Sequence, residues 1–299
     1  SQLGGSPLNT VVPAAAAAPL PSATQGSGPA AHTILVVGDS VMRRLAPQLA
    51  QTAADRGLVI ASAARGGCSA LDVVVVDGSG TPNYACTQEV PATQSTLLAR
   101  SQAATVVWWS RYELADRLGA GGELLRAGTP AFWTAQREAL ARTVDRLTAQ
   151  GATLVVVEVD RIGVGIDSRC TPMDCDPLLA RLRNDDGLRV TWNRLLAERA
   201  ASDDRVRLVR MDDLYCRDTA NPCDDHLPIR TSPAGDFAGP TGSELARPDG
   251  SHFAAHAIPG VSAALLDRVA RAAGAAASAS TRSGATRRAS DTARQDTPR

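Results

Sequence analysis

Three residues near opposite ends of the chain have the types and spacing that nucleophilic catalysis needs. Ser40 follows Gly38 and Asp39 at the end of an apolar run. Asp249 and His252 lie three residues apart, in a loop that contains a glycine. This spacing lets the carboxylate hydrogen-bond one imidazole nitrogen while the other faces outward, and an imidazole held in this way is a suitable general base for a serine hydroxyl. Taken alone, Asp249 could be an ordinary loop aspartate and His252 an ordinary surface histidine. Their combination with Ser40 favours a catalytic site.

The surroundings of Ser40 predict that it stands where a strand gives way to a helix. Thr33–Val37 is a short apolar run that predicts a buried strand, and Val41–Asp55 has apolar residues at helical spacing. A hydroxyl at a helix N-terminus faces free amides and the positive end of the helix dipole, and both favour a developing oxyanion. Serine is also a common N-cap residue. The position of Ser40 alone therefore leaves a catalytic and a capping role open.

The elements that must position these residues alternate along residues 32–273. The strands that we predict are Thr33–Val37, Leu58–Ala61, Thr105–Trp109, Thr153–Val157 and Val206–Val209. The helices that we predict are Val41–Asp55, Ala92–Gln102, Ala131–Gln150, Leu188–Ala201 and Val261–Ala272. Continuous apolar strands that alternate with amphipathic helices are typical of a parallel sheet covered on both faces. We expect an α/β fold, a three-layer α/β/α sandwich with a central parallel sheet. Val73–Val76 stays ambiguous between a strand and an edge element.

The two ends of the chain differ in composition from the segment between them. Residues 1–31 carry no charge and are rich in Ala, Pro, Ser and Gly, which predicts a disordered linker. Residues 274–299 contain small and polar residues with several arginines, which predicts a disordered tail. This tail is either simply solvated or weakly attracted to an anionic surface. The sequence thus predicts one folded domain over residues 32–273.

Charge and hydropathy exclude some classes of function. The chain has 31 basic and 31 acidic residues. It therefore lacks the net charge that drives binding to nucleic acid, and we expect no nucleic-acid partner. No segment reaches the ~18 to 20 apolar residues that cross a bilayer, so the chain as it stands is expected to be soluble. The chain begins without Met or a signal peptide, which suggests a fragment or a processed form.

The six cysteines predict disulfides. They fall into locally spaced pairs: Cys68 with Cys86, Cys170 with Cys175, and Cys216 with Cys223. Zinc sites usually place cysteines two to four residues apart in two clusters, and these spacings are longer. Six cysteines allow 15 pairings; we expect the sequential one, because each pair shares one loop-like segment. Disulfides indicate an oxidising, extracytoplasmic compartment. His226 and His256 are interpreted as polar loop residues, and we expect no metal and no cofactor.

In these motifs and their order, the chain resembles the SGNH (GDSL-type) hydrolase superfamily. Gly38-Asp39-Ser40-Val41 is similar to the first block of that superfamily, and Asp249-Gly-Ser-His252 to the last. The resemblance implies a catalytic triad with Ser40 as nucleophile, His252 as base and Asp249 as the residue that orients the base. It also implies an oxyanion-hole glycine after the second strand. Gly66 or Gly67 fits that place, and Gly67 is the candidate that we favour; a plain turn is the alternative.

In this chain, the segment that corresponds to the third block of the superfamily departs from the usual pattern. That block normally reads Gly-x-Asn, and its Asn completes the oxyanion hole. The third predicted strand instead ends in Trp-Trp-Ser-Arg-Tyr-Glu, so Ser110 or Arg111 takes the place of the Asn. Loss of one oxyanion donor typically raises the barrier by ~2.7 to 4 kcal/mol. Trp108 and Trp109 are either core residues or the lining of a sugar-binding groove.

These departures resemble one subgroup, the extracytoplasmic SGNH domain at the C-terminus of acyltransferase-3 (AT3) membrane proteins. Such proteins O-acylate cell-envelope glycans, and the uncharged segment 1–31 is where a preceding membrane domain would be joined. The resemblance implies transfer of an acyl group, most simply acetyl, through an acyl-serine onto a hydroxyl of an envelope glycan or glycolipid. The fused membrane domain would deliver the acyl donor and tether the protein to the membrane. The alternatives are a free-standing secreted esterase and a non-catalytic glycan-binding module.

Overall fold

The computed structural model describes residues 32–168, 170, 175–225 and 245–274, with the backbone alone at 229–230 and 237–238. The predicted linker 1–31 lies outside the described residues. So does the predicted tail 274–299, apart from Gly274, and so does His226. The disorder predicted for both ends therefore stays a prediction.

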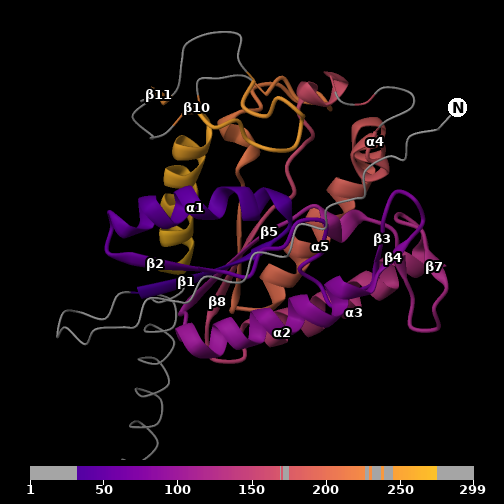
Figure 1. Ribbon diagram of the computed structural model, residues 1–299, viewed down its shortest axis with the longest axis horizontal. Helices are drawn as coiled ribbons and strands as arrows, with labels where there is room; N and C mark the ends of the chain where they lie inside the picture. Colours follow the sequence, from indigo (N-terminus) through magenta and orange to yellow (C-terminus); the bar gives the residue numbers. More distant parts are fainter. Residues whose placement is uncertain are drawn as a thin grey trace, which may run out of the picture. The chain divides into compact units, whose positions relative to one another are not determined.

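The central sheet has five parallel strands, as expected. They are β1 (His32–Gly38), β2 (Leu58–Ser62), β5 (Thr105–Trp109), β8 (Thr153–Val157) and β9 (Val206–Val209). Their spatial order is β2-β1-β5-β8-β9 (Figure 1). Counted in chain order within this sheet, that is 2-1-3-4-5, the doubly wound order of flavodoxin-like folds. The order reverses between β1 and β5, and ligands of such sheets bind beyond the carboxyl ends of the strands at that point. Ser40 follows β1, and Ser110 follows β5.

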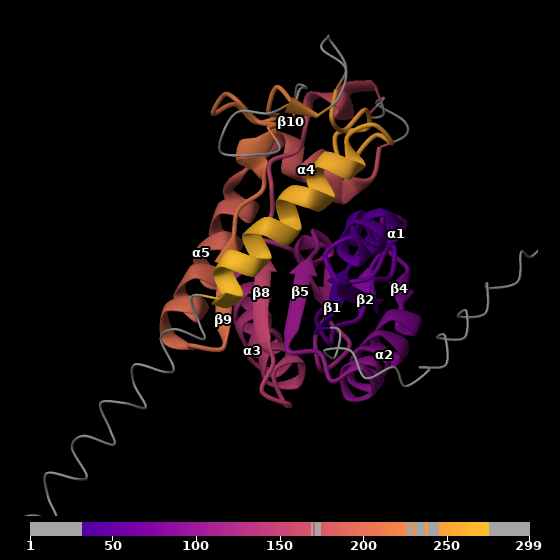
Figure 2. The ribbon, with the colours of Figure 1, turned by 90° about the vertical axis from the view of Figure 1, so that its left-hand side faces the viewer.

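Helices cover both faces of this sheet and complete the three layers. One face packs against α1 (Ser40–Ala54) and the C-terminal helix over residues 258–274. The other packs against α2 (Tyr84–Ser101), α3 (Pro130–Leu147) and α5 (Gly187–Ser202). Figure 1 shows α1 on one side of the sheet and α2 and α3 on the other, and Figure 2 shows the yellow C-terminal helix crossing in front of β8 and β9.

Trp108 and Trp109 are core residues, and the sugar-groove interpretation of these two side chains is wrong. Successive residues of a strand point to opposite faces, so the two rings enter different cores. Trp108 is 2% exposed and packs edge-on against Trp192 of α5 at 6.3 Å between ring centroids. Trp109 is 0% exposed and packs against Phe253 at 5.7 Å. These contacts hold the end of β5 in place.

The helix predictions are confirmed in kind, but several boundaries are corrected. α3 ends at Leu147 and not at Gln150, and the C-terminal helix begins at residue 258 and not at Val261.

The largest correction is in α2. α2 begins at Tyr84, well before the predicted start at Ala92. Its first turn is capped by the side chain of Asn83, and Pro91 lies inside the helix. The other described helices are α4 (Pro177–Asn184) and three short 3₁₀ turns, η1 (Tyr112–Leu114), η2 (Val164–Ser168) and η3 (Asp212–Leu214).

A small antiparallel sheet settles the ambiguity at Val73–Val76. Val75–Val76 forms β3, which pairs with β4 (Pro82–Asn83) and β6 (Arg117–Leu118) outside the main sheet. β7 (Leu124–Leu125) pairs with β6 and completes it. The remaining two strands, β10 (Ile229–Arg230) and β11 (Phe237–Ala238), pair with each other.

Three disulfides are present, and the sequential pairing is confirmed. Cys68 pairs with Cys86, Cys170 with Cys175, and Cys216 with Cys223. The first bridge ties the segment after β2 to the first turn of α2. Among the described helices, none has the length and apolar character needed to cross a membrane.

Candidate active site

The fold brings Ser40, His252 and Asp249 together. Oγ of Ser40 lies 2.8 Å from Nε2 of His252, and Nδ1 of that ring lies 2.8 Å from Oδ2 of Asp249. The other oxygen, Oδ1 of Asp249, accepts hydrogen bonds from the amides of Ser251 (2.9 Å) and His252 (2.6 Å). The carboxylate therefore holds both the ring and the backbone that carries it. This is the hydrogen-bonding pattern of a nucleophile, a base and an orienting acid.

The surroundings of Asp249 keep its carboxyl group ionised. Burial raises the pKa of Asp249, but hydrogen bonds from the His252 ring and from the amides of His252 and Ser251 outweigh it. The net result is a pKa well below the usual aspartate value. An ionised carboxylate next to Nδ1 favours the tautomer that carries its proton there, which leaves Nε2 free to accept the proton of Ser40.

Asp39, and not Ser40, caps helix α1. Its Oδ1 accepts the amide of Val41 at 2.8 Å, and its Oδ2 accepts the amide of Arg111 at 2.7 Å. Ser40 is the first residue inside the helix, where an amide has no intrahelical partner. Its hydroxyl faces His252 instead of the helix backbone. The capping alternative for Ser40 is therefore wrong.

Gly38 lets the end of β1 approach the end of β5. Its φ is 148°, and a Cβ at this position would collide with the carbonyl oxygen of Trp109. Gly38 and Trp109 are register partners in the two parallel strands. A glycine at this position therefore lets the Ser40 turn lie directly beside the segment that follows β5.

The glycine loop, which we define as residues 64–70, lies beside the end of β1 and close to Ser40. The amide of Arg65 donates to the carbonyl of Gly38 at 2.8 Å, which holds the loop at the end of β1. A Cβ on Gly66 would lie 3.6 Å from the Cβ of Ser40, whereas one on Gly67 would meet nothing within 4 Å. Gly67 has a φ of 72°, which suits glycine in the turn closed by the amide of Cys68 and the carbonyl of Arg65. Gly66 therefore stays a candidate oxyanion donor beside Gly67.

Ser110 and Arg111 follow β5 and are both buried. The hydroxyl of Ser110 accepts the amide of Tyr112 at 3.3 Å. The amide of Arg111 donates to Asp39, so it is not free to donate to an oxyanion. The Arg111 guanidinium contacts Ser251 and takes part in a buried ion-pair network. Among the described residues, no hydrogen bond joins either side chain to Ser40.

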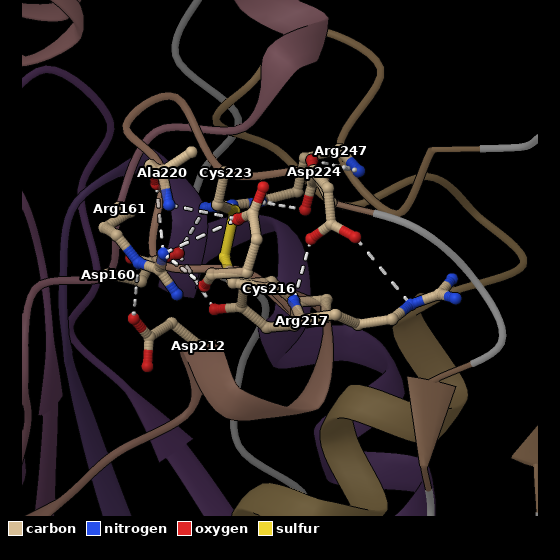
Figure 3. Close-up of a disulfide and its surroundings, with 12 residues drawn as sticks. Asp160, Arg161, Asp212, Cys216, Arg217, Ala220, Cys223, Asp224 and Arg247 are labelled. Atoms are coloured by element: carbon tan, nitrogen blue, oxygen red, sulfur yellow. Dashed lines mark hydrogen bonds and ion pairs between the residues drawn. A yellow bond between two sulfur atoms is a disulfide. The ribbon is translucent and has the colours of Figure 1, made fainter.

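The buried ion-pair network consists of Arg111, Asp160, Arg247 and Asp225. Both oxygens of Asp160 accept from Nη2 of Arg111, at 2.8 and 2.7 Å, and Oδ2 also binds Arg247. Nε of Arg247 donates to Asp225 at 2.9 Å, and its guanidinium lies 4.5 Å from the ring centre of Tyr215. Figure 3 shows Arg247 and Asp160 around the Cys216–Cys223 disulfide.

Sequence analysis named Arg111 but missed Asp160, Arg247 and Asp225, although two of these three had a positional signal. Asp160 follows the carboxyl end of β8, on the edge of the sheet where Ser40 and Arg111 also lie. Arg247 stands two residues before Asp249 and begins the triad loop, residues 247–252. Two arginines and two aspartates balance in charge, as buried ionic groups require. The network therefore links the end of the sheet to the triad loop.

Glu113 holds the end of the glycine loop at Ser69 and Ala70. Its Oε1 accepts the amide of Ala70 at 2.8 Å, the hydroxyl of Ser69 at 3.2 Å and Nε1 of Trp108 at 3.1 Å. The side chain is fully buried, and burial raises the pKa of Glu113. The Trp-Ser-Arg-Tyr-Glu motif thus contacts both loops that flank the nucleophile: Arg111 the triad loop and Glu113 the glycine loop.

No candidate metal centre emerges from the part of the chain that the structure describes. Within these residues, three or more His, Cys, Asp or Glu side chains do not gather in a geometry that could hold an ion. The six cysteines are all engaged in disulfides.

A family match now accounts for this combination of fold and residues. Residues 11–229 match the family described as "SGNH domain (fused to AT3 domains)". The chain belongs to this family. Membership makes it a serine-dependent enzyme of the esterase and acyltransferase class, and the three disulfides agree with the extracytoplasmic location of these domains. The match ends before Asp249 and His252, so their assignment depends on the geometry described above.

Solved structures with a similar fold include acetyltransferase and lipase domains. The periplasmic domain of a lipopolysaccharide acetyltransferase from Salmonella ser. Paratyphi A is 16% identical, with 81% of this chain and 83% of that chain covered and a TM-score of 0.45. The C-terminal catalytic domain of peptidoglycan O-acetyltransferase A from Streptococcus pneumoniae is 13% identical, with 83% and 96% covered and a TM-score of 0.38. A GDSL-like lipase from Bacteroides thetaiotaomicron is 10% identical, with 80% and 88% covered and a TM-score of 0.46. No curated protein matches the chain.

Proposed function

We propose that the chain is the O-acyltransferase domain of an AT3-type system and that it acts through an acyl-Ser40 intermediate. The observation that carries this proposal is the continuous hydrogen-bonded relay from Asp249 through His252 to Ser40. A triad is the arrangement that makes a serine hydroxyl nucleophilic at neutral pH. Family membership supports the acyltransferase class.

In the first half-reaction, Oγ of Ser40 attacks the acyl carbonyl and Nε2 of His252 takes its proton. The oxyanion that forms faces the N-terminus of α1, where the amide of Ser40 and a glycine-loop amide, from Gly66 or Gly67, are the proposed donors. The carbonyl re-forms as the bond to the leaving group breaks, and His252 returns the proton to that group. The acyl group is left as an ester on Ser40.

In the second half-reaction, an acceptor hydroxyl replaces the leaving group. His252 removes the proton of that hydroxyl as its oxygen attacks the acyl-Ser40 carbonyl, and it then protonates Oγ of Ser40 as the ester bond breaks. The product is an acylated acceptor and free enzyme. No cofactor takes part in either step.

The substrates that we propose are an acetyl donor and a glycan or glycolipid of the cell envelope. An AT3 membrane domain on the same polypeptide would supply the acyl group at the extracytoplasmic face and tether the domain there. The fusion named in the family description supports this partner. The two acetyltransferase domains of similar fold are described as acting on lipopolysaccharide and peptidoglycan, which are envelope glycans.

A secreted esterase is the second candidate, because one observation favours it. Trp108 and Trp109, the aromatic residues that would have stacked on a sugar, are buried in the core. The same site hydrolyses its ester whenever water enters before the acceptor. A non-catalytic glycan-binding module is disfavoured, because all three triad residues are present and hydrogen-bonded to one another.

Partitioning of the acyl group distinguishes the two enzymes. The isolated domain is incubated with an acetyl ester and with a series of envelope oligosaccharides, and free acetate and acetylated sugar are measured together. We expect slow release of acetate and faster turnover when an acceptor is present, because a bound hydroxyl is positioned beside the acyl-Ser40 carbonyl and bulk water is not. Rapid release of acetate that no acceptor changes would favour the esterase.

A further inference from the structure

Arg111 connects the nucleophile, the central sheet and the triad loop. Its amide donates to Oδ2 of Asp39, the residue next to the nucleophile, at 2.7 Å. Nη1 of its guanidinium donates to the carbonyl (3.0 Å) and the hydroxyl (2.7 Å) of Ser251. Nη2 donates to both oxygens of Asp160, at 2.8 and 2.7 Å. Both terminal nitrogens of the guanidinium are therefore engaged.

Ser251 is the residue through which Arg111 reaches the triad. It lies between Asp249 and His252, and its own amide donates to Oδ1 of Asp249 at 2.9 Å. Ser251 is thus held on one side by the triad acid and on the other by Arg111. The peptide that follows Ser251 carries His252, so the guanidinium determines where the imidazole stands relative to Ser40.

Asp160 gives Arg111 a rigid anchor. Burial raises the pKa of Asp160, but attraction by Arg111 and Arg247 outweighs it, so the carboxylate stays ionised. The hydroxyl of Tyr215 also donates to Asp160, at 2.9 Å. The planar guanidinium binds Asp160 through Nη2 and Ser251 through Nη1 at a fixed mutual geometry. A lysine ammonium has one nitrogen and cannot reproduce this bridge.

We propose that Arg111 is a positioning residue for His252, acting through Ser251 and anchored on Asp160. This inference deepens the proposed function and rests on it, because the residue that Arg111 positions is the proposed base. It assigns a role to Arg111, one of the two residues that could take the place of the third-block Asn. The Asn would touch the oxyanion directly, whereas Arg111 acts through the loop that carries the base.

A direct role for the guanidinium is incompatible with its surroundings. Arg111 is 1% exposed, and its terminal nitrogens are occupied by Ser251 and Asp160. Contact with a substrate or an oxyanion would require those bonds to break. Arg111 therefore affects the rate of acylation through geometry, and it leaves binding of the acyl donor unchanged.

The test compares Arg111→Lys and Ser251→Ala with the unaltered domain. Each is treated with a serine-directed fluorophosphonate, and the second-order rate constant and the final labelled fraction are both measured. For Arg111→Lys we expect complete labelling with a rate constant roughly 10- to 100-fold lower, since a 1 Å misplacement of catalytic groups costs about that much. Ser251→Ala keeps the carbonyl contact, and we expect a loss of about 3- to 10-fold. With an acetyl ester, kcat falls and KM stays constant.

Arg161→Lys is the matched control. Arg161 is also buried, pairs with Asp212, and donates to the carbonyls of Asp218 (2.7 Å) and Ala220 (3.0 Å) (Figure 3). Among the described residues, no hydrogen bond or ion pair connects it with the triad loop. We expect this variant to react with the fluorophosphonate at the rate of the unaltered domain.

The possible outcomes separate the inference from the function on which it rests. Unchanged rate constants in both variants would overturn the positioning role. An incomplete labelled fraction with an unchanged rate constant would also overturn it, because it would show that Arg111 serves folding alone. Ser251→Ala decides the matter where Arg111→Lys does not fold. Failure of the unaltered domain to label at Ser40 would refute the proposed function itself, and the inference with it.

Discussion

The proposed chemistry depends on a few residues, and the roles proposed for them follow from their hydrogen-bond partners. Asp39 takes the cap of α1, which leaves the Ser40 hydroxyl to His252. Ser40, Asp249 and His252 could be predicted from sequence, because residue type, spacing and the strand-to-helix turn all favour the same interpretation. The ion pairs of Asp160 and Asp225 could not be predicted, because they depend on which loops the fold brings together. The position of Asp160 after β8 marks the residue but not its partners.

Ser40→Ala is expected to abolish turnover of a chromogenic acetyl ester and to leave the fold intact. Removal of a triad nucleophile costs on the order of 10⁶ in kcat in a well-studied serine enzyme, because no other group forms the ester. Ester hydrolysis and circular dichroism are measured on the same preparation. Hydrolysis at the original rate by a folded variant would remove Ser40 from the mechanism.

Asp249→Asn is expected to lower stability at neutral pH and to lose part of this effect as the pH falls from ~4 to 3. The pKa of Asp249 in the folded state lies below its unfolded value of ~3.9. The ionised carboxylate therefore stabilises the fold above pH ~4, and this contribution is lost as the pH falls through the folded pKa. We expect the variant to be about 1.5 kcal/mol less stable at pH 7.

The measurement is urea unfolding of wild type and Asp249→Asn between pH 7 and pH 3. Ser40→Ala, which keeps the carboxylate, is the control and should follow the pH dependence of the wild type. A stability difference that stays constant over this pH range would show that Asp249 does not have a lowered pKa.

Long helices and strands with a clear pattern of apolar residues were predicted better than short ones. β5, β8 and β9 have the predicted bounds, because a continuous apolar run between turns is a clear signal. The strands of the small antiparallel sheet have two residues each, which is too short to show a periodicity. The start of α2 was predicted too late, at Ala92. The helix contains Pro91, a residue type that usually ends or kinks a helix.

The Cys68–Cys86 disulfide constrains the glycine loop. The bridge closes a sequence separation of 18 residues, between the loop and the first turn of α2. Replacing both cysteines by serine should cost about 3 kcal/mol of unfolding free energy. It should also lower kcat, because the loop that carries Gly66 and Gly67 loses its covalent anchor and keeps only hydrogen bonds, among them those to Gly38 and Glu113.

Thermal unfolding and ester kinetics check this prediction, with Cys170→Ser/Cys175→Ser as the control. That bridge spans a sequence separation of 5 and does not include the glycine loop, so its removal should leave kcat unchanged. Equal effects of the two double variants on kcat would show that the glycine loop does not depend on its disulfide.

For the whole molecule, the arrangement places the site at one edge of the sheet, where the strand order reverses between β1 and β5. Three segments distant in sequence meet there: the Ser40 turn, the glycine loop and the triad loop. The Trp-Ser-Arg-Tyr-Glu segment after β5 contacts the last two. The fold and the enzyme class followed from sequence patterns, whereas the acceptor has no signature in them, because its recognition depends on surfaces that only the folded protein creates.

The central claim is that the acyl group passes through Ser40. The domain is mixed with an acetyl ester, quenched within the first turnovers and digested, and the peptides are analysed by mass spectrometry. We predict an acetyl group on the peptide that contains Ser40, its absence in Ser40→Ala, and its faster loss when an acceptor oligosaccharide is added before the quench. Turnover without an acetylated Ser40 peptide, or acetylation of another residue that persists in Ser40→Ala, would contradict the account.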